Sequence, residues 1–273
     1  MTLSQIPKDR TVDALGSVWS SMRQLLGGLA EAQWAAPTSL PGWDVAANVA
    51  HVIGTERMLM GETPAAEVDR QGLDHVRNDI GAMNEAWVVE LRELGVADLL
   101  AEFDRVTAAR LATLNEMPLA EWDAESFTPA GTDSFGRFMQ IRVFDSWFHE
   151  QDIREAVGKP GHGAGPAVVV ALDEVTTALG FVVGKRAGVP QGSSVTFELT
   201  GTSGRTIHVD VAERARVVED LGGPATVKIT LPVLAFTRLC GGRTTIDRVR
   251  NDVEVSGDEA LGEQILENLA YTI

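Results

Sequence analysis

The hydrophobic pattern of this chain changes its period on either side of one short run, GKPGHGAGP at residues 158–166. Before the run, apolar residues recur at spacings of three and four, which is typical of amphipathic helices. After it, several segments alternate between apolar and polar residues, which is typical of strands. At 273 residues the chain also exceeds one domain of roughly 100 to 200 residues. We therefore predict two domains, residues 1–160 and 167–273, with this run as the linker.

The first domain is predicted to consist of helices and loops. The predicted helices span residues 11–35, 44–60, 80–115 with an interruption near Gly95, and a last segment that begins at a cap among Thr132, Asp133 and Ser134 and ends near Val157. Pro41 and Gly42 break the chain before the second helix, and Asp44 is well placed to cap it. Residues 61–79 and 122–134 have polar, irregular sequences and are predicted as loops.

The second domain is predicted to combine a sheet with helices. Residues 167–187 have the composition of a helix of small and β-branched residues. The predicted strands are 194–200, 206–212, 225–231 and 252–256, and two further helices are predicted at 232–239 and 258–270. Gly201 and Gly204 indicate a hairpin between the first two strands. This order fits an α+β domain in which helices cover a sheet.

One face of the helix before the linker carries an unusual set of charged side chains. Asp145, His149 and Asp152 stand at positions i, i+4 and i+7, which a helix of 3.6 residues per turn places on one face. Apolar neighbours on this face indicate that the charged groups point toward protein. Buried charge is costly unless it is paired or binds a metal. Catalytic zinc sites commonly use three protein ligands and keep a fourth position open, and His51, on another helix, is a candidate for the third.

Two plainer interpretations of these residues stay open. An aspartate and a histidine at helical spacing also form surface ion pairs, or lie in a core with their hydrogen bonds satisfied. On the second predicted helix the apolar stripe runs from Val45 to Met60, and His51 lies away from it. Periodicity therefore does not show that His51 faces a site. His75 and His162 are predicted to be solvated loop residues, and His208 is predicted to be a strand residue without a direct role.

Three segments in this chain follow the motifs of one known family in the same order. They are SLPGWDVAANVAHVIG at 39–54, FDSWFHEQDIREAVGKPG at 144–161 and, more weakly, LPVLAFTRLCGGR at 231–243. On these segments the chain resembles the mycothiol-dependent maleylpyruvate isomerase family over nearly its whole length. The resemblance implies the α+β fold class, with an amino-terminal DinB-like four-helix bundle followed by a smaller sterol-carrier-like α/β sandwich domain.

The resemblance also implies a metal site at His51, Asp145 and His149, with a divalent ion, zinc, as the expected metal. The family usually has glutamate where this chain has Asp145, and the shorter side chain draws the carboxylate back by one methylene. Either the metal shifts to meet it or Asp152 helps. We expect Asp152 to support the site, by orienting a histidine ligand or by pairing with an arginine.

The expected chemistry follows from the same resemblance. A thiol that coordinates zinc is deprotonated, which makes a nucleophile at neutral pH. In the family this thiol belongs to mycothiol, which adds to the cis double bond of maleylpyruvate, so that rotation and elimination release the trans isomer. Related DinB-like proteins instead transfer the thiol to an electrophile. We predict an isomerase or S-transferase that uses mycothiol as cosubstrate on a small molecule. The rival prediction is a noncatalytic protein that binds a small apolar ligand and holds a structural metal.

Four arginines are candidates for binding anionic groups. Arg142 shares the helical face of the predicted ligands, and Arg154 follows shortly after it. Both are candidate cofactor-binding residues, and pairing with Asp145 or Asp152 is the structural alternative. Arg238 and Arg243 are candidate catalytic residues that hold a substrate carboxylate at an interdomain cleft, because arginine binds carboxylates with two parallel hydrogen bonds.

Charge and cysteine content exclude several classes of protein. The net charge of −16 and the pI near 4.7 disfavour binding to nucleic acids and to anionic membranes. The single cysteine, Cys240, lies in the apolar run LAFTRLC and is predicted to be buried, so a reactive thiol is expected to come from outside. We find neither the apolar core of a signal peptide nor a run of roughly 18 apolar residues, and expect a cytoplasmic enzyme that is a monomer or homodimer.

Overall fold

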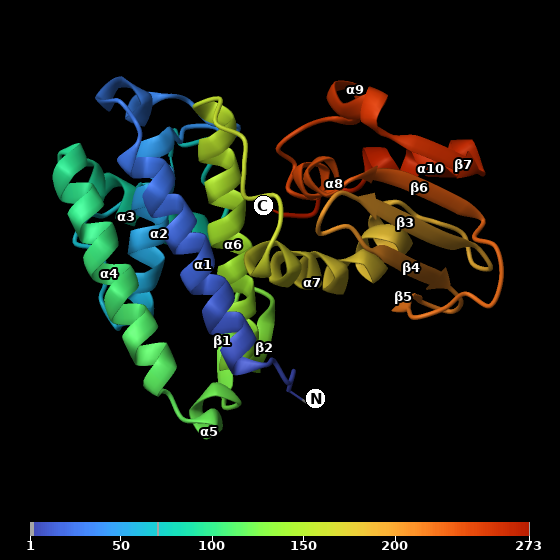
Figure 1. The fold of residues 1–273 in the computed structure, drawn as a ribbon, viewed down its shortest axis with the longest axis horizontal. Helices are drawn as coiled ribbons and strands as arrows, with labels where there is room; N and C mark the ends of the chain where they lie inside the picture. Colours follow the sequence, from blue (N-terminus) through green and yellow to red (C-terminus); the bar gives the residue numbers. More distant parts are fainter. Residues whose placement is uncertain (1–2, 70, 273) are drawn as a thin grey trace. The chain divides into compact units, whose positions relative to one another are not determined.

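The structure describes residues 3–69 and 71–272. The chain forms two compact units. The computed structural model divides into Met1–Gly161 and His162–Ile273 (Figure 1). In the described residues, the first unit consists mainly of helices with one short hairpin, and the second combines helices with a five-stranded sheet. The predicted α+β fold class, with a helix-rich region followed by a region that contains a sheet, is confirmed.

Within the described residues, four long helices form the body of the first unit. They are α1 (Lys8–Gly27), α2 (Val45–Leu59), α4 (Val96–Glu116) and α6 (Phe135–Ala156), with α3 (Asp79–Arg92) beside α2. α1 packs on α4 and α6, whereas α2 packs on α3, α4 and α6 (Figure 1). The shorter elements of this unit are η1 (Glu31–Ala35), α5 (Leu119–Trp122), β1 (Glu125–Thr128) and β2 (Gly131–Ser134).

Two predicted helix caps are confirmed by side-chain hydrogen bonds. Asp44 precedes α2 and accepts a hydrogen bond from the backbone N–H of Ala47 at 2.8 Å. Ser134 precedes α6 and accepts one from the backbone N–H of Arg137 at 3.1 Å. Each cap satisfies a backbone donor that has no partner inside the first helical turn. These caps fix where the two helices begin, and therefore which of their residues meet at mid-length.

The first predicted helix is longer than the observed one, whereas the interruption predicted in the third helix is observed. The first helix ends at Gly27 and not at residue 35, because two adjacent glycines, Gly27 and Gly28, disfavour helix continuation. The interruption predicted near Gly95 is confirmed, since α3 ends at Arg92 and α4 begins at Val96.

The helix α2 is buried around most of its circumference. Eleven of its residues between Val45 and Glu56 are buried, since α3, α4 and α6 all contact this helix. Gly54 permits the close approach of α3, because a Cβ atom there would lie 2.4 Å from side-chain atoms of Trp87. His51 is therefore buried although it lies away from the apolar stripe of its helix.

A five-stranded sheet lies at the centre of the second unit. Its order is β5–β4–β3–β6–β7, with β3 and β6 parallel and the other neighbours antiparallel. The strands are β3 (Ser194–Thr200), β4 (Thr206–Val211), β5 (Ala215–Val218), β6 (Val227–Pro232) and β7 (Glu254–Gly257). The helical elements are α7 (Pro166–Phe181), η2 (Val182–Arg186), α8 (Val233–Cys240), α9 (Ile246–Val249), η3 (Arg250–Asp252) and α10 (Glu259–Glu267). The predicted hairpin of the first two strands, β3 and β4, is confirmed.

The strands that the sequence pattern did not predict are short and have mixed polarity. Residues 122–134, predicted as a loop, contain the antiparallel hairpin of β1 and β2, in which Thr128 faces Gly131. The edge strand β5 pairs with β4 and was also missed. Strands of four residues without regular apolar alternation carry little of the signal that identifies a strand in sequence.

One stretch in the described residues, Pro166–Arg186, is long and apolar enough to cross a membrane by length and composition alone. Its apolar window is 56% buried, and Asp173 and Glu174 interrupt its apolar sequence. α7 packs on β4, β5 and α8 within its own unit. These features are those of the core helix of a folded domain.

Candidate metal centre

The predicted ligands come together where α2 and α6 pack on each other. His51 lies in the middle of α2, and Asp145 and His149 lie one turn apart in α6. His51 Nε2 lies 3.2 Å from Asp145 Oδ2, and His149 Nε2 lies 3.5 Å from Asp145 Oδ1. One ligand atom from each of the three residues lies within 4.8 Å of the other two. The carboxylate is therefore shared between the two imidazoles.

Burial and the shared carboxylate determine the charge of this cluster. His51 and His149 are 4% and 5% exposed, whereas 28% of the Asp145 side chain is exposed. Burial lowers the pKa of His51 despite the neighbouring carboxylate of Asp145. Burial acts in the same direction on His149, but Asp145 and Asp152 outweigh it and raise the pKa of His149. Burial would raise the pKa of Asp145, but Arg142 and the two histidines hold it well below its usual value.

His149 is held by acceptors at its second ring nitrogen. Nδ1 lies 2.8 Å from Asn48 Oδ1 and 3.5 Å from Asp152 Oδ2. The amide nitrogen of Asn48 donates to the backbone oxygen of Asp44 at 2.9 Å, so its oxygen remains to accept. Ser39 Oγ in turn donates to Asp152 Oδ1 at 3.1 Å. Nδ1 therefore donates within this network, and Nε2 is the ring nitrogen that faces Asp145.

Asn48 is a member of this network that the sequence analysis missed. It lies one turn before His51 on α2, and this spacing of three residues could have identified it from the sequence. Asp152 is fully buried and lies beside His149, which is the position that a supporting residue needs. Its effect on metal binding stays a prediction.

The donor set fits a zinc ion. Two imidazole nitrogens and a carboxylate oxygen are ligands that catalytic zinc sites use while the fourth position stays open. Among the described residues, no donor or acceptor reaches the buried Nδ1 atom of His51. One ring nitrogen of His51 therefore has no hydrogen-bond partner from the described part of the protein. The exposed part of Asp145 makes the cluster accessible to a ligand from solvent.

Trp43 covers one side of the two histidines. Its ring centroid lies 5.1 Å from that of His51 and 5.9 Å from that of His149. The two imidazoles are themselves 4.6 Å apart in a T-shaped arrangement. Trp43 belongs to the turn of proline, glycine and tryptophan that precedes α2. Its indole ring therefore lies against both histidines.

Comparison with known protein families gives two matches that together span both units. The model of the mycothiol maleylpyruvate isomerase N-terminal domain matches residues 15–154, and that of the MDMPI C-terminal domain matches residues 169–264. The chain belongs to the mycothiol maleylpyruvate isomerase family. The resemblance inferred from the three sequence segments is thereby confirmed.

Solved structures show the same fold for members of this family. The crystal structure of the mycothiol-dependent maleylpyruvate isomerase is 17% identical, with a TM-score of 0.54 over 92% of this chain and 93% of that chain. A histidine-to-alanine mutant of that isomerase is also 17% identical and has a TM-score of 0.58 over the same shares of the two chains.

Two uncharacterized proteins, from two strains of Mycobacterium tuberculosis, are similar in sequence. Each is 29% identical over 140 residues, which cover 49% of this chain and 51% of the relative. The chain thus spans about half the length of the curated relatives it matches. These relatives carry no described activity to compare with the cluster.

Arg142 and Arg154, the predicted cofactor-binding residues of this family member, have acidic partners within the first unit. Arg142 is buried, and it donates from Nη1 to Asp145 Oδ2 at 2.5 Å and from Nε to Glu56 Oε1 at 2.8 Å. Arg154 Nε donates to Glu150 Oε1 at 2.8 Å. The contact between Arg142 and Asp145 is the one that the structural alternative describes, whereas Arg154 pairs with a glutamate. Cofactor binding by either arginine stays a prediction.

The other predicted residues lie in the second unit. Arg238 is in the last turn of α8, and Arg243 follows this helix with its Nη1 donating to the backbone oxygen of Gly241 at 2.6 Å. Their contact with a substrate stays a prediction. Cys240 is fully buried, as predicted, and burial raises the pKa of its thiol. Cys240 therefore lacks the exposed thiolate that nucleophilic catalysis needs.

Two of the remaining histidines have partners that the sequence did not reveal. His75 lies in a loop, as predicted, but it is not fully solvated, since its Nε2 lies 3.1 Å from Oε2 of the buried Glu85. The loop before α3 thus folds back onto the helices. His208 Nδ1 lies 2.9 Å from Thr196 Oγ1 on the neighbouring strand, which is a contact within the sheet.

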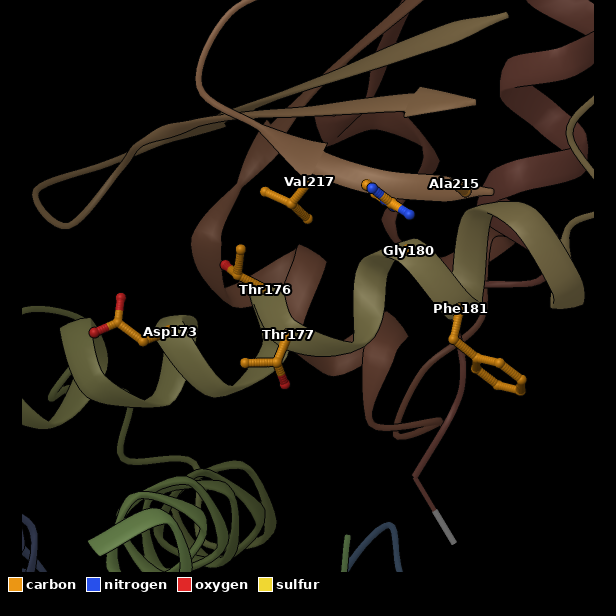
Figure 2. Close-up of a pocket in the computed structure, with 8 residues that line it drawn as sticks. Asp173, Thr176, Thr177, Gly180, Phe181, Ala215 and Val217 are labelled. Carbon is orange, nitrogen blue, oxygen red and sulfur yellow. The ribbon is translucent and has the colours of Figure 1, made fainter. Parts of the chain in front are cut away.

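A hollow of about 410 Å³ lies in the second unit between α7 and β5. Figure 2 shows its two sides, with Asp173, Thr176, Thr177, Gly180 and Phe181 on the helix and Ala215 and Val217 on the strand. Asp173 accepts a hydrogen bond from Arg205 Nη1 at 2.6 Å. The lining residues include no histidine or cysteine. This hollow therefore does not offer the ligands that the metal and thiol chemistry requires.

Proposed function

We propose that this chain is an enzyme that uses an exogenous low-molecular-weight thiol, mycothiol, together with a divalent metal ion, zinc, on a small electrophilic substrate. The observation that carries the proposal is the convergence of His51, Asp145 and His149, whose ligand atoms lie within 4.8 Å of one another. Family membership supports the choice of thiol. The reaction is proposed to be an isomerisation or an S-transfer in the cytoplasm.

His51, Asp145 and His149 would hold the metal through two imidazole nitrogens and one carboxylate oxygen. When bound, zinc supplies a Lewis-acidic centre that lowers the pKa of a coordinated thiol. The thiol would approach the metal past the exposed part of Asp145, which is 28% of that side chain. Asn48 and Asp152 keep His149 Nδ1 protonated, so that Nε2 faces the ligand position.

Arg142 is proposed to position the carboxylate of Asp145. Its guanidinium bridges Asp145 and the fully buried Glu56, which also accepts a hydrogen bond from Arg110 at 2.8 Å. The two arginines and the two carboxylates balance in charge, which reduces the cost of burying them. The hydrogen bond from Arg142 limits the rotation of the Asp145 carboxylate.

The reacting thiol is proposed to come from outside the chain. Cys240 is the only cysteine in the sequence, and it is fully buried with a raised pKa. In the isomerase form of the proposal, the thiolate adds to a cis carbon–carbon double bond of the substrate. The resulting single bond rotates, and elimination returns the thiol with the trans product. In the transferase form, the carbon–sulfur bond is kept, and the neighbouring carbon takes up a proton in place of the elimination.

Arg238 and Arg243 are proposed to bind the carboxylate of an anionic substrate. Arginine provides a planar pair of donors that matches a carboxylate. Replacing either arginine with lysine is expected to raise KM for a carboxylate substrate while leaving metal content unchanged. An unchanged KM in both variants would remove this role.

The decisive experiment combines metal analysis with product analysis. The protein is purified without added zinc, its metal content is measured by mass spectrometry, and it is then incubated with mycothiol and a panel of electrophiles. A stoichiometric divalent metal and turnover that depends on mycothiol are expected. Metal without turnover on any electrophile would favour a noncatalytic binding protein, and turnover that is independent of thiol would favour a metal-dependent hydrolase.

A further inference from the structure

Trp43 is connected to two polar side chains that belong to neither α2 nor α6. Its indole Nε1 donates to Glu85 Oε2 of α3 at 2.8 Å. His75 Nε2, from the loop before α3, lies 3.1 Å from the same carboxylate oxygen. The side chains of Glu85 and His75 are 6% and 20% exposed. Glu85 therefore joins the tryptophan that covers the metal centre to a histidine nearer the surface.

The backbone of the turn is anchored independently of the indole ring. Thr38 Oγ1 donates to the backbone oxygen of Trp43 at 2.8 Å, and Arg92 Nη2 donates to that of Gly42 at 3.1 Å. These bonds hold the main chain at Trp43 without any contribution from Glu85. The hydrogen bond of Glu85 therefore acts on the angle of the ring and leaves the path of the turn to other contacts.

Gly42 allows His75 to approach the turn. Its φ angle is +81°, and a Cβ atom there would lie 2.9 Å from two ring atoms of His75. Any other residue would strain the backbone and push this imidazole away. The absence of a side chain at Gly42 thus brings His75 within reach of Glu85.

A buried carboxylate is costly unless donors surround it, and charge-assisted hydrogen bonds are the strong ones. Glu85 is buried and has the Trp43 indole and the His75 imidazole at one oxygen. Rotating the indole away would leave this carboxylate with fewer donors. The three side chains therefore stabilise one orientation of the tryptophan.

We propose that Glu85 and His75 are positioning residues, which set the angle of the Trp43 ring and through it the orientations of His51 and His149. The proposal rests on the proposed function, because the orientation of the imidazoles matters most when they share an ion. A fixed ring against both histidines limits their rotation. Residues that orient metal ligands typically change metal affinity by about 10- to 100-fold when they are replaced.

The first test uses the metal-free protein. The indole N–H resonance of Trp43 is assigned by NMR with Trp43→Phe, and the imidazole resonances with His51→Ala and His149→Ala. Glu85→Gln replaces the charged acceptor with a neutral amide and is expected to move the indole resonance and both sets of imidazole resonances. His75→Ala is expected to move the same resonances by less, and His75→Gln to restore them toward wild type because glutamine can donate to Glu85.

The second test measures cobalt affinity and the visible spectrum of the cobalt-substituted protein. Glu85→Gln is expected to weaken cobalt binding by about 10-fold and to shift the ligand-field bands. Trp122→Phe is the matched control, because it removes a buried indole hydrogen bond, to the backbone oxygen of Ile6 at 2.7 Å, elsewhere in the first unit. This control is expected to leave the spectrum unchanged.

The outcomes separate this proposal from the proposed function. If the wild-type protein binds no cobalt, the proposed function fails, and the resonances of the metal-free protein still decide the positioning role. If Glu85→Gln and His75→Ala both fold and leave the Trp43 and imidazole resonances in place, the positioning role is overturned. His75 is the less buried of the two residues, so His75→Ala provides the test if Glu85→Gln fails to fold.

Discussion

His51 Nε2 lies 3.2 Å from Asp145 Oδ2, although 94 residues separate the two in the sequence. The contact joins α2 to α6 and leaves the second carboxylate oxygen of Asp145 facing His149. Both oxygens of one aspartate are thus engaged by histidines. Replacement of any of these three residues is therefore expected to affect the other two.

Replacing either histidine should remove the metal. His51→Ala and His149→Ala each delete one of three proposed ligands, and we expect each variant to retain less than about a tenth of the wild-type metal content, because two ligands hold zinc weakly. Metal content is measured by mass spectrometry after dialysis. His162→Ala, outside the cluster, is the control and should retain the metal. Stoichiometric metal in both site variants would show that the ligand set is wrong.

Asn48 and Asp152 should affect the metal through His149. Asn48→Ala and Asp152→Ala each remove an acceptor near His149 Nδ1, and we expect zinc affinity to fall by about 10- to 100-fold. Competition with a chromophoric chelator measures this affinity. Glu155→Ala changes an exposed acidic residue near the end of the same helix and serves as the control. Wild-type affinity in both variants would mean that they have no part in orienting the histidine.

Protonation of Asp145 in acid should lower the free energy of unfolding of the metal-free protein. Its folded-state pKa lies well below the usual value of 3.8, so the unfolded chain binds the proton first as pH falls. The stabilisation from this carboxylate is complete above the usual pKa and is lost as pH falls through the lower folded-state pKa. Urea unfolding across this range should show a smaller acid loss for Asp145→Asn than for wild type. Parallel pH profiles for the two proteins would contradict this account, with Asp104→Asn as an exposed control.

Arg142 should contribute to stability as well as to the site. Arg142→Ala leaves the buried Glu56 with one arginine fewer, and the free energy of unfolding is expected to fall by about 3–5 kcal/mol. Arg23→Ala breaks an exposed pair with Asp104 and should cost less than about 1 kcal/mol. Urea denaturation compares the two variants. Unchanged stability combined with weaker mycothiol binding would instead support a role for Arg142 in cofactor binding.

The thiol should be supplied from solution. Cys240→Ala is expected to retain turnover, because this buried thiol is not the nucleophile, whereas omission of mycothiol should abolish turnover. Mycothiol added to the cobalt-substituted protein should produce a thiolate charge-transfer band in the visible or near-ultraviolet region. The absence of this band at saturating thiol, together with thiol-independent turnover, would argue for a different reaction at the same cluster.

Contacts within single elements were predictable from the sequence. Asp145 and His149 share a face because the helical repeat places residues four apart one above the other. The caps at Asp44 and Ser134 follow from the chemistry of side chains beside a helix start. The short strands β1, β2 and β5 were missed because four residues of mixed polarity carry little periodic signal.

The tertiary structure alone decided which residues outside α6 reach the candidate site. His51 lies off the apolar stripe of α2 and is nevertheless buried, because three other helices surround α2. Asn48 and Trp43 reach the histidines from α2 and the turn before it, and Glu85 reaches Trp43 from α3. The helical repeat relates residues of one helix to each other, whereas contacts between helices depend on how their surfaces pack, which no local pattern of residues specifies.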